Sequence, residues 1–421
     1  MYLLTEVIPL IIKNYFLLFT DPEFLLLIAL VVALIALQYR RSESVRAAMF
    51  GIKPRRLWRD TFSATLLGLA GGVAGSILIV LAGLPLTGSG LIFVLFLLIA
   101  ALLMLINPRF ICFAYAGGII SLVNIFTGWP PVNIYQVLAL VALLHMVESL
   151  LIFFSGHLGA VPSFFRDASG RVVGGFTLQK FWPIPLVALT VAGYSTSQGI
   201  LNDMPQWWPL IKPGEAGGQH NNVIYALVAV VAGLGYGDLA VARSPWEKSR
   251  LSALYLALYS VILFILSIFA QYFRFLAPVA AIFSPLGHEL VIYIGKKIEL
   301  AGRPVFTPSK LGLRVLDVVP ESIAWHMGIR SGDVLITVGG IPVRDRWGLK
   351  YALENIPGPL EIEYLKGAAR IYNRGWAFRH GVNKPLGVLP VPAGDEEYFI
   401  DIKSQGTVYK KFVSWWEKIK R

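Results

Sequence analysis

Residues 312–343 read GLRVLDVVPESIAWHMGIRSGDVLITVGGIPV, and this stretch predicts a small soluble module. Apolar and polar residues alternate over 313–318, as in a strand that is buried on one side. The sequence Pro-Glu-Ser at 320–322 then favours the start of a short helix, and Gly328 suits the left-handed residue that ends such a helix. A strand followed by a short capped helix is therefore expected here.

The pattern continues downstream of this helix. Ser331-Gly332-Asp333 turns the chain into a second strand over 334–338, and Gly339-Gly340 predicts a tight hairpin turn. A second helix is expected over 346–355 and a further strand over 360–365. The module thus alternates strands with two short helices.

This succession resembles a PDZ domain, in the form common in bacterial membrane proteases and scaffolds. The motif residues that carry the resemblance are Gly312, Gly328, Gly332 and Asp333. The resemblance implies that an extended peptide binds by strand addition beside a carboxylate-binding loop.

Three residues are the nearest candidate for that loop, and they are Leu386, Gly387 and Val388 in the sequence PLGV. Their place after the last predicted strand implies a permuted strand order. Two alternatives remain open at this stage. The three residues form a simple sheet turn, or Tyr-Ile-Gly at 293–295 provides the loop.

The rest of the chain is far more apolar than this module. Of 421 residues, 56% are hydrophobic and 15% are charged, and the mean hydropathy is +0.65. Because soluble domains carry roughly a quarter charged residues, this chain lacks the polar surface to cover itself in water. We therefore predict a polytopic α-helical membrane bundle with a C-terminal PDZ-like β-sandwich or barrel module.

Long apolar runs predict the membrane spans. A span needs about 20 apolar residues and must be helical, because lipid offers the backbone no hydrogen-bond partners. The candidate spans are 23–39, 61–83, 89–106, 110–127, 133–155, 181–198, 222–242 and 251–271. A ninth stretch, 275–295, is interrupted by prolines and by His288-Glu289, and it is a bent span, a re-entrant segment or an interfacial helix.

Four regions follow from these patterns. Residues 1–20 are expected to form an amphipathic helix on the membrane surface, because Glu6 and Lys13 interrupt their apolar run. Residues 21–295 form the bundle of eight or nine helices, residues 296–392 the PDZ-like domain, and residues 393–421 a basic tail.

The charge distribution predicts the orientation in the membrane. Lys and Arg of the apolar region cluster in short loops, as the positive-inside rule requires, and no nucleic-acid motif accompanies the net charge of +12. Segment 40–59 holds seven basic residues against Glu43 and is expected in the cytoplasm. The PDZ-like domain is also expected in the cytoplasm, which requires segment 275–295 to cross the membrane; if this segment does not cross, the domain lies outside.

Glycines recur four residues apart in the second span, as the pairs Gly68/Gly72 and Gly71/Gly75. Small residues at this spacing let backbones approach closely. Packing inside one bundle is the favoured interpretation over packing between copies.

Two short motifs suggest chemistry and are interpreted as structural. His288-Glu289 begins the His-Glu-x-x-His signature of site-2-type zinc proteases, but Ile292 replaces the second histidine. The two residues are interpreted as an interfacial polar pair at the bend before the module, and no metal or cofactor is expected in this chain. Gly235-Tyr236-Gly237-Asp238 matches the Gly-x-Gly-Asp of intramembrane aspartyl proteases, but no partner aspartate lies in another span. A structural role for Asp238 with Arg243 or Lys248 is expected.

Ionisable residues also occur inside the fifth span. His145 and Glu148 lie three residues apart and so share a helix face. At this depth such groups usually face a bundle interior or a substrate path. A buried pair that fixes helix packing is the favoured interpretation, and a proton or ion path is the alternative. The single cysteine, Cys112, is taken to exclude intrachain disulfides and thiol metal clusters.

The whole layout resembles the MinJ-type topological determinants of cell division in Gram-positive bacteria. The shared features are the amphipathic start, the basic first loop, GYGDLAVARSPWEKSR at 235–250, and the terminal PDZ-like domain. The resemblance implies a non-enzymatic adaptor in the bacterial cell membrane that binds division or polar scaffold proteins. A site-2-protease-like metalloprotease, active or degenerate, is the alternative.

Overall fold

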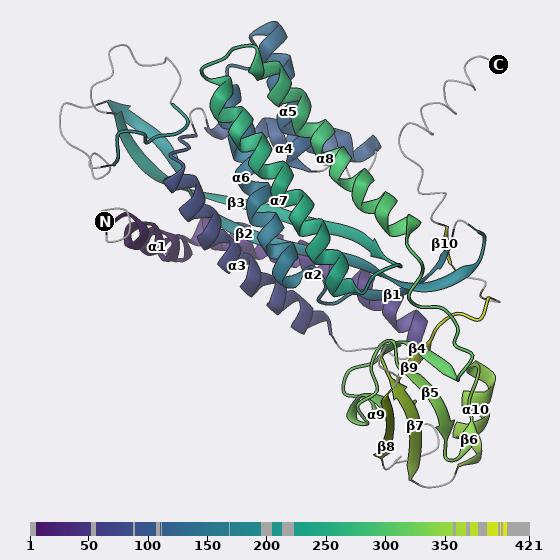
Figure 1. The fold of residues 1–421 in the computed structure, drawn as a ribbon. Helices are drawn as coiled ribbons and strands as arrows, with labels where there is room; N and C mark the ends of the chain where they lie inside the picture. The colour runs from purple at the N-terminus through teal and green to yellow at the C-terminus, as the bar shows by residue number, and fades with distance from the viewer. Residues whose placement is uncertain are drawn as a thin grey trace.

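The computed structural model describes residues 6–401 apart from 52–55, 87–88, 107–109, 111, 168, 195–203, 213–222, 357–358, 368–370, 378–384, 395 and 397–398. A group of helices surrounds a long β-hairpin, and a small α/β module lies at one end of it (Figure 1). The basic tail predicted at 393–421 falls mostly outside the described residues.

Helices form most of the first 155 residues and residues 245–301. They are α1 (Ile8–Leu17), α2 (Pro22–Phe50), α3 (Leu57–Leu81), α4 (Ser89–Ile106), α5 (Phe113–Thr127), α6 (Ile134–Ser155), α7 (Pro245–Ala270) and α8 (Leu276–Ala301), with a 3-10 turn η2 (Leu18–Thr20) after α1. Among the described residues, α2, α3, α6, α7 and α8 are long and apolar enough to cross a membrane. The chain is a helical membrane protein, as predicted. Residues 276–295 lie within α8, which continues past Pro285.

Two predicted spans are not helices. Strand β2 (Val172–Tyr194) replaces the helix predicted at 181–198, and strand β3 (Val223–Ala240) replaces the helix predicted at 222–242. The two strands pair in antiparallel register along nearly their whole length. The predictions failed because hydropathy measures only how apolar a segment is, and a strand in apolar surroundings reads as a continuous apolar run, as a helix does. The predicted number of helices is therefore too high by two.

The edge of β2 away from β3 is closed by side chains instead of by another strand. β1 (Val161–Arg166) pairs only with the first residues of β2. Farther along, Tyr39 Oη accepts the Phe181 N–H at 3.3 Å and Ser76 Oγ accepts the Val187 N–H at 2.8 Å. Pro183 and Pro185 lie between them and have no N–H to satisfy. These residues let an open sheet edge lie in apolar surroundings.

The glycines of α3 bring this helix against that edge. A Cβ added at Gly68 would lie 2.2 Å from the Pro183 carbonyl oxygen, and one at Gly72 would lie 2.1 Å from the Pro185 carbonyl oxygen. Gly71 instead faces Leu151 of α6. The paired glycines thus allow close packing inside one chain, against strand β2 on one side of α3 and helix α6 on the other.

The C-terminal module has a core of its own. Its sheet has the order β8-β7-β5-β4-β9, with β6 beside β5. The strands are β4 (Leu313–Val318), β5 (Val334–Val338), β6 (Ile341–Pro342), β7 (Leu360–Lys366), β8 (Ile371–Ala377) and β9 (Val388–Pro390), and the helices are α9 (Ile323–His326) and α10 (Arg346–Asn355). The predicted positions of the two helices and of the first three main strands are confirmed.

Two terminal segments pack on the membrane region. Val7, Ile11 and Tyr15, from around α1, are buried, and Tyr15 Oη donates to the Leu69 carbonyl of α3. At the other end, β10 (Ile400–Asp401) pairs in parallel with β1. The segment that follows the module thus returns to the sheet of the membrane region.

Candidate functional site

The predicted peptide-binding loop leads into the last strand of the module. β9 pairs with β4 in antiparallel fashion and is the terminal strand of that sheet among the described residues. Just before it, Leu386 and Gly387 each accept one backbone hydrogen bond, from Ala324 and Val319 respectively. Gly387 adopts a φ of +82° against Ser322, where a Cβ would clash. The loop is therefore built into the fold beside the start of α9.

A cavity of about 100 Å³ lies between the segment that follows β9 and the start of α10. Trp347 of α10 lines it and is 71% exposed. Basic side chains lie along the same cavity, and they are Arg314, Arg344 and Arg346. Asp345 and Glu396 also line it, so the cavity offers an aromatic surface with charges of both signs next to a terminal strand.

The other PDZ motif residues have structural roles. Asp333 is buried, and its carboxylate accepts the backbone N–H groups of Arg330 and Gly367, each at 2.8 Å. Gly328 and Gly332 have φ values of +84° and +90° and form the turns that end α9 and precede β5. A Cβ at Gly312 would lie 2.1 Å from the Leu335 carbonyl oxygen. These residues set the fold of the module, and Gly312 also lines the cavity beside α10.

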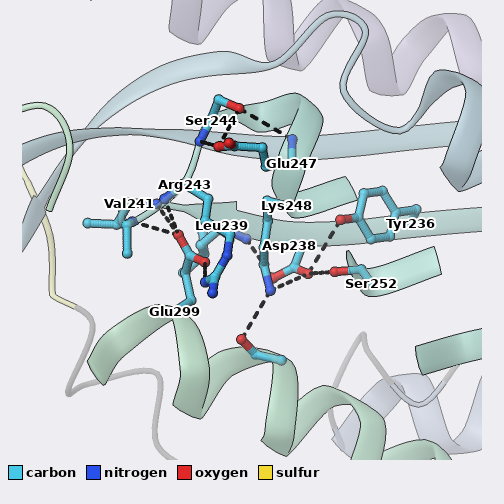
Figure 2. A network of polar contacts seen from close by, with 12 residues as sticks. Tyr236, Asp238, Leu239, Val241, Arg243, Ser244, Glu247, Lys248, Ser252 and Glu299 are labelled. Atoms are coloured by element: carbon cyan, nitrogen blue, oxygen red, sulfur yellow. Dashed lines mark hydrogen bonds and ion pairs between the residues drawn. The ribbon is translucent and has the colours of Figure 1, made fainter. Parts of the chain in front are cut away.

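A polar network joins the end of the hairpin to α7 and α8 (Figure 2). Asp238 pairs with the buried Lys248 at 3.0 Å and accepts a hydrogen bond from Ser252 at 2.7 Å. Lys248 also donates to the Gly295 carbonyl of α8 at 3.1 Å. Asp238 therefore has the structural partner that was predicted for it in Lys248, whereas Arg243 pairs with Glu299.

Glu299 is the second centre of this network. Its Oε1 accepts three consecutive backbone N–H groups, those of Val241, Ala242 and Arg243, at 2.7, 2.6 and 3.1 Å. Its Oε2 accepts from the Arg243 guanidinium at 3.1 Å. The buried carboxylate thus attaches the last turns of α8 to the chain between β3 and α7, directly before the C-terminal module begins.

A third cluster lies among α5, α6 and α8. His145 Nε2 lies 3.0 Å from Cys112 Sγ, and His288 Nε2 lies 3.6 Å from the same sulfur. Glu148 Oε2 is 3.9 Å from His145 Nε2. The predicted pair of His145 and Glu148 therefore belongs to a larger group, and His288 lies inside the bundle instead of at a bend before the module.

A hydrogen-bonded pair flanks His288. Its Nδ1 lies 3.4 Å from Tyr115 Oη, and that hydroxyl donates to Glu289 Oε1 at 2.5 Å. The motif His288-Glu289 thus faces α5, while Ile292 still occupies the position where a zinc protease motif has its second histidine.

Comparison with known proteins agrees with this architecture. A PDZ domain family model matches residues 314–355. The cell division topological determinant MinJ of Bacillus subtilis (strain 168) is 23% identical over 273 residues, which cover 64% of this chain. The chain resembles MinJ. The matched region spans 63% of the length of MinJ, so less than two thirds of that protein is represented.

The PDZ match supports a protein-binding domain in a chain whose described residues include helices long and apolar enough to cross a membrane. The PDZ match runs from β4 to α10 and so includes the start of α10 at the cavity. Leu386, Gly387 and Val388 lie outside the matched residues, and their role in binding remains a prediction.

The module packs on the membrane region through apolar side chains. Leu316 of β4, Leu389 of β9 and Val391 are buried in the same core as Phe306 and the helices. Asp317 follows Leu316 in β4. Burial raises the pKa of the Asp317 carboxyl to about 6, although the charges of Arg46 and Arg56 oppose this shift. The protonation state of Asp317 therefore depends on its burial at this junction.

The raised pKa of Asp317 predicts a pH dependence of stability. An unfolded aspartate has a pKa near 3.9, so the folded state binds more protons between about pH 4 and pH 6. The charged carboxylate therefore lowers stability as pH rises through this window, by up to about 3 kcal/mol. Asp317→Asn is expected to raise the unfolding temperature at pH 7.5 and to leave it nearly unchanged at pH 4. Parallel pH profiles for the two proteins, measured by thermal unfolding in detergent, would contradict this.

Sequence reasoning missed the association of Cys112 with the two histidines. His145 lies 33 positions after Cys112 and His288 lies 176 positions after it, so no short motif links the three residues. One signal was present, since all three are metal-ligand types inside apolar segments, where polar side chains are usually functional.

Proposed function

We propose that this protein is a membrane-anchored adaptor whose PDZ domain binds a peptide segment of a division or polar scaffold protein. On this proposal it acts in placing the division site and catalyses no reaction. The supporting observation is the terminal strand β9, which follows the Leu386–Gly387 turn and adjoins a cavity lined by Trp347. β9 itself packs against α2 and the main core, so the peptide would lie along the cavity, where Trp347 would contact one of its side chains.

We further propose that the module lies on the cytoplasmic face of a bacterial cell membrane. The basic segment 40–59 includes the end of α2, which contacts β9. Two arginines of that segment, Arg46 and Arg56, act electrostatically on Asp317 of the module. Since short basic segments remain in the cytoplasm, a module packed beside one shares its side of the membrane.

Photo-crosslinking in living bacteria tests the binding site. Benzoylphenylalanine is placed at Trp347, beside the cavity, or at Trp376, which is 56% exposed on the opposite terminal strand β8. Both positions exchange one exposed aromatic residue for another. We expect discrete adducts with division proteins, identified by mass spectrometry, from position 347 and a yield at least several-fold lower from position 376.

Two results would contradict the proposal. Equal yields from both positions would mean that contact does not depend on the β9 side of the module. Adducts that contain only a second copy of this chain would indicate that the module binds its own kind and is not an adaptor for other proteins.

A further inference from the structure

We propose that Cys112, His145 and His288 bind a divalent transition-metal ion, with zinc as the expected ion and Glu148 as the fourth ligand. The site lies among α5, α6 and α8 and is separate from the PDZ module. The thiolate, imidazole and carboxylate groups offered here are the set that zinc accepts in proteins.

The positions of the ligand atoms fit a tetrahedral ion. One sulfur and two nitrogens, from Cys112, His145 and His288, all lie within 4.8 Å of one another. With a Zn–S bond of about 2.3 Å and Zn–N bonds of about 2.0–2.1 Å, a tetrahedral site needs sulfur and nitrogen about 3.6 Å apart. The observed separations from Cys112 Sγ are 3.0 and 3.6 Å. Small side-chain rotations therefore suffice to admit the ion.

The hydrogen bonds of the histidines present the correct nitrogens. His145 Nδ1 lies 2.7 Å from the Val141 carbonyl oxygen, which only accepts, so Nδ1 carries the proton and Nε2 directs its lone pair at the cluster. Tyr115 gives its hydroxyl proton to Glu289, so its oxygen is able to accept from His288 Nδ1. Such outer partners are the usual means of orienting metal-bound histidines.

Charge balance supports Glu148 as the remaining ligand. It follows His145 by three residues on the same helix, and its carboxylate is 3.9 Å from His145 Nε2. Glu148 lies outside the set of three ligand atoms that are within 4.8 Å of one another, so its side chain must move toward the ion to bind it. A zinc ion bound by one thiolate and one carboxylate forms a neutral unit. Neutrality matters here because Cys112, His145 and Glu148 lie in apolar segments, where uncompensated charge is costly.

A four-ligand site would be closed and structural. It would connect three helices that are far apart in the sequence, and it would leave no open position for a substrate. This separates the proposed site from a protease centre, which needs a water ligand in the fourth position.

The test uses the full chain purified in detergent without chelator. We expect about one zinc per chain by elemental mass spectrometry. After chelation, CoCl2 titration should give a thiolate-to-cobalt charge-transfer band and the intense visible bands of tetrahedral cobalt, saturating at one equivalent. Zinc should displace the cobalt and raise the unfolding temperature.

Variants identify the ligands. Cys112→Ser should abolish the charge-transfer band, and His288→Ala and Glu148→Gln should weaken metal binding at least tenfold. His157→Ala is the matched control, because this histidine lies just beyond the end of α6 and outside the cluster, so it should retain full binding. The cobalt spectrum is measured on the unmodified protein, so the proposal can be tested even if a variant misfolds. A folded native protein that takes up neither zinc nor cobalt would overturn the proposal, as would a thiolate band that survives Cys112→Ser.

Discussion

Gly72→Leu is expected to destabilise the membrane region by about 3 kcal/mol or more. A Cβ at this position would lie 2.1 Å from the Pro185 carbonyl oxygen and 2.7 Å from Tyr15 Oη. A backbone carbonyl within a strand cannot rotate away, so α3 must move. That movement would also remove Ser76 Oγ from the Val187 N–H and expose the edge of β2. Thermal unfolding followed by size-exclusion chromatography in detergent measures the effect.

The control for this variant lies on the same helix. Ala70→Leu adds a similar volume to an exposed position of α3, where no neighbour needs to shift. We expect a change within about 0.5 kcal/mol for this variant. Equal losses from both substitutions would show that leucine disturbs α3 itself, and close contact with β2 would no longer explain the glycines.

Glu299→Ala is expected to cost about 3–5 kcal/mol, because it breaks a buried ion pair and leaves its partners unsatisfied. Three backbone N–H groups and the Arg243 guanidinium lose their acceptor at once. The last turns of α8 should then detach from the chain between β3 and α7. Thermal unfolding measures the loss of stability, and limited proteolysis after Ala301 should become faster.

Two variants bracket this effect. Glu299→Gln keeps an acceptor oxygen for the backbone groups but loses the charge, so an intermediate loss is expected. Glu354→Ala removes an exposed pair with Lys350, whose atoms are 3.9 Å apart, and should cost less than about 1 kcal/mol. If Glu299→Ala is as mild as Glu354→Ala, the network in Figure 2 does not hold α8 in place.

The PDZ module was predictable from the sequence because its elements are set locally. Gly328 and Gly339-Gly340 adopt the positive φ values that their turns require. Asp345 accepts the Gly348 N–H and begins α10 where the sequence predicts a helix. Each of these signals acts within a few residues of the chain, so no knowledge of distant partners was needed.

The long hairpin was misread although signals for it were present. Pro183 and Pro185 are spaced two apart, as are Gly233, Gly235 and Gly237, and this period belongs to a strand. Two prolines so close together also disfavour a helix interior. Hydropathy outweighed these signals because it measures how apolar a segment is and does not report which groups its backbone bonds to.

By itself, the sequence determined the separation into a lipid-covered region and a water-exposed PDZ module, because composition and local turn chemistry are properties of short segments. Only the tertiary structure decided that two apolar segments pair as strands against α3. It also decided that Glu299 accepts three N–H groups 56 to 58 positions away, and that Cys112 meets histidines of two other helices. These features depend on which distant segments pack together, and packing is set by the whole chain at once.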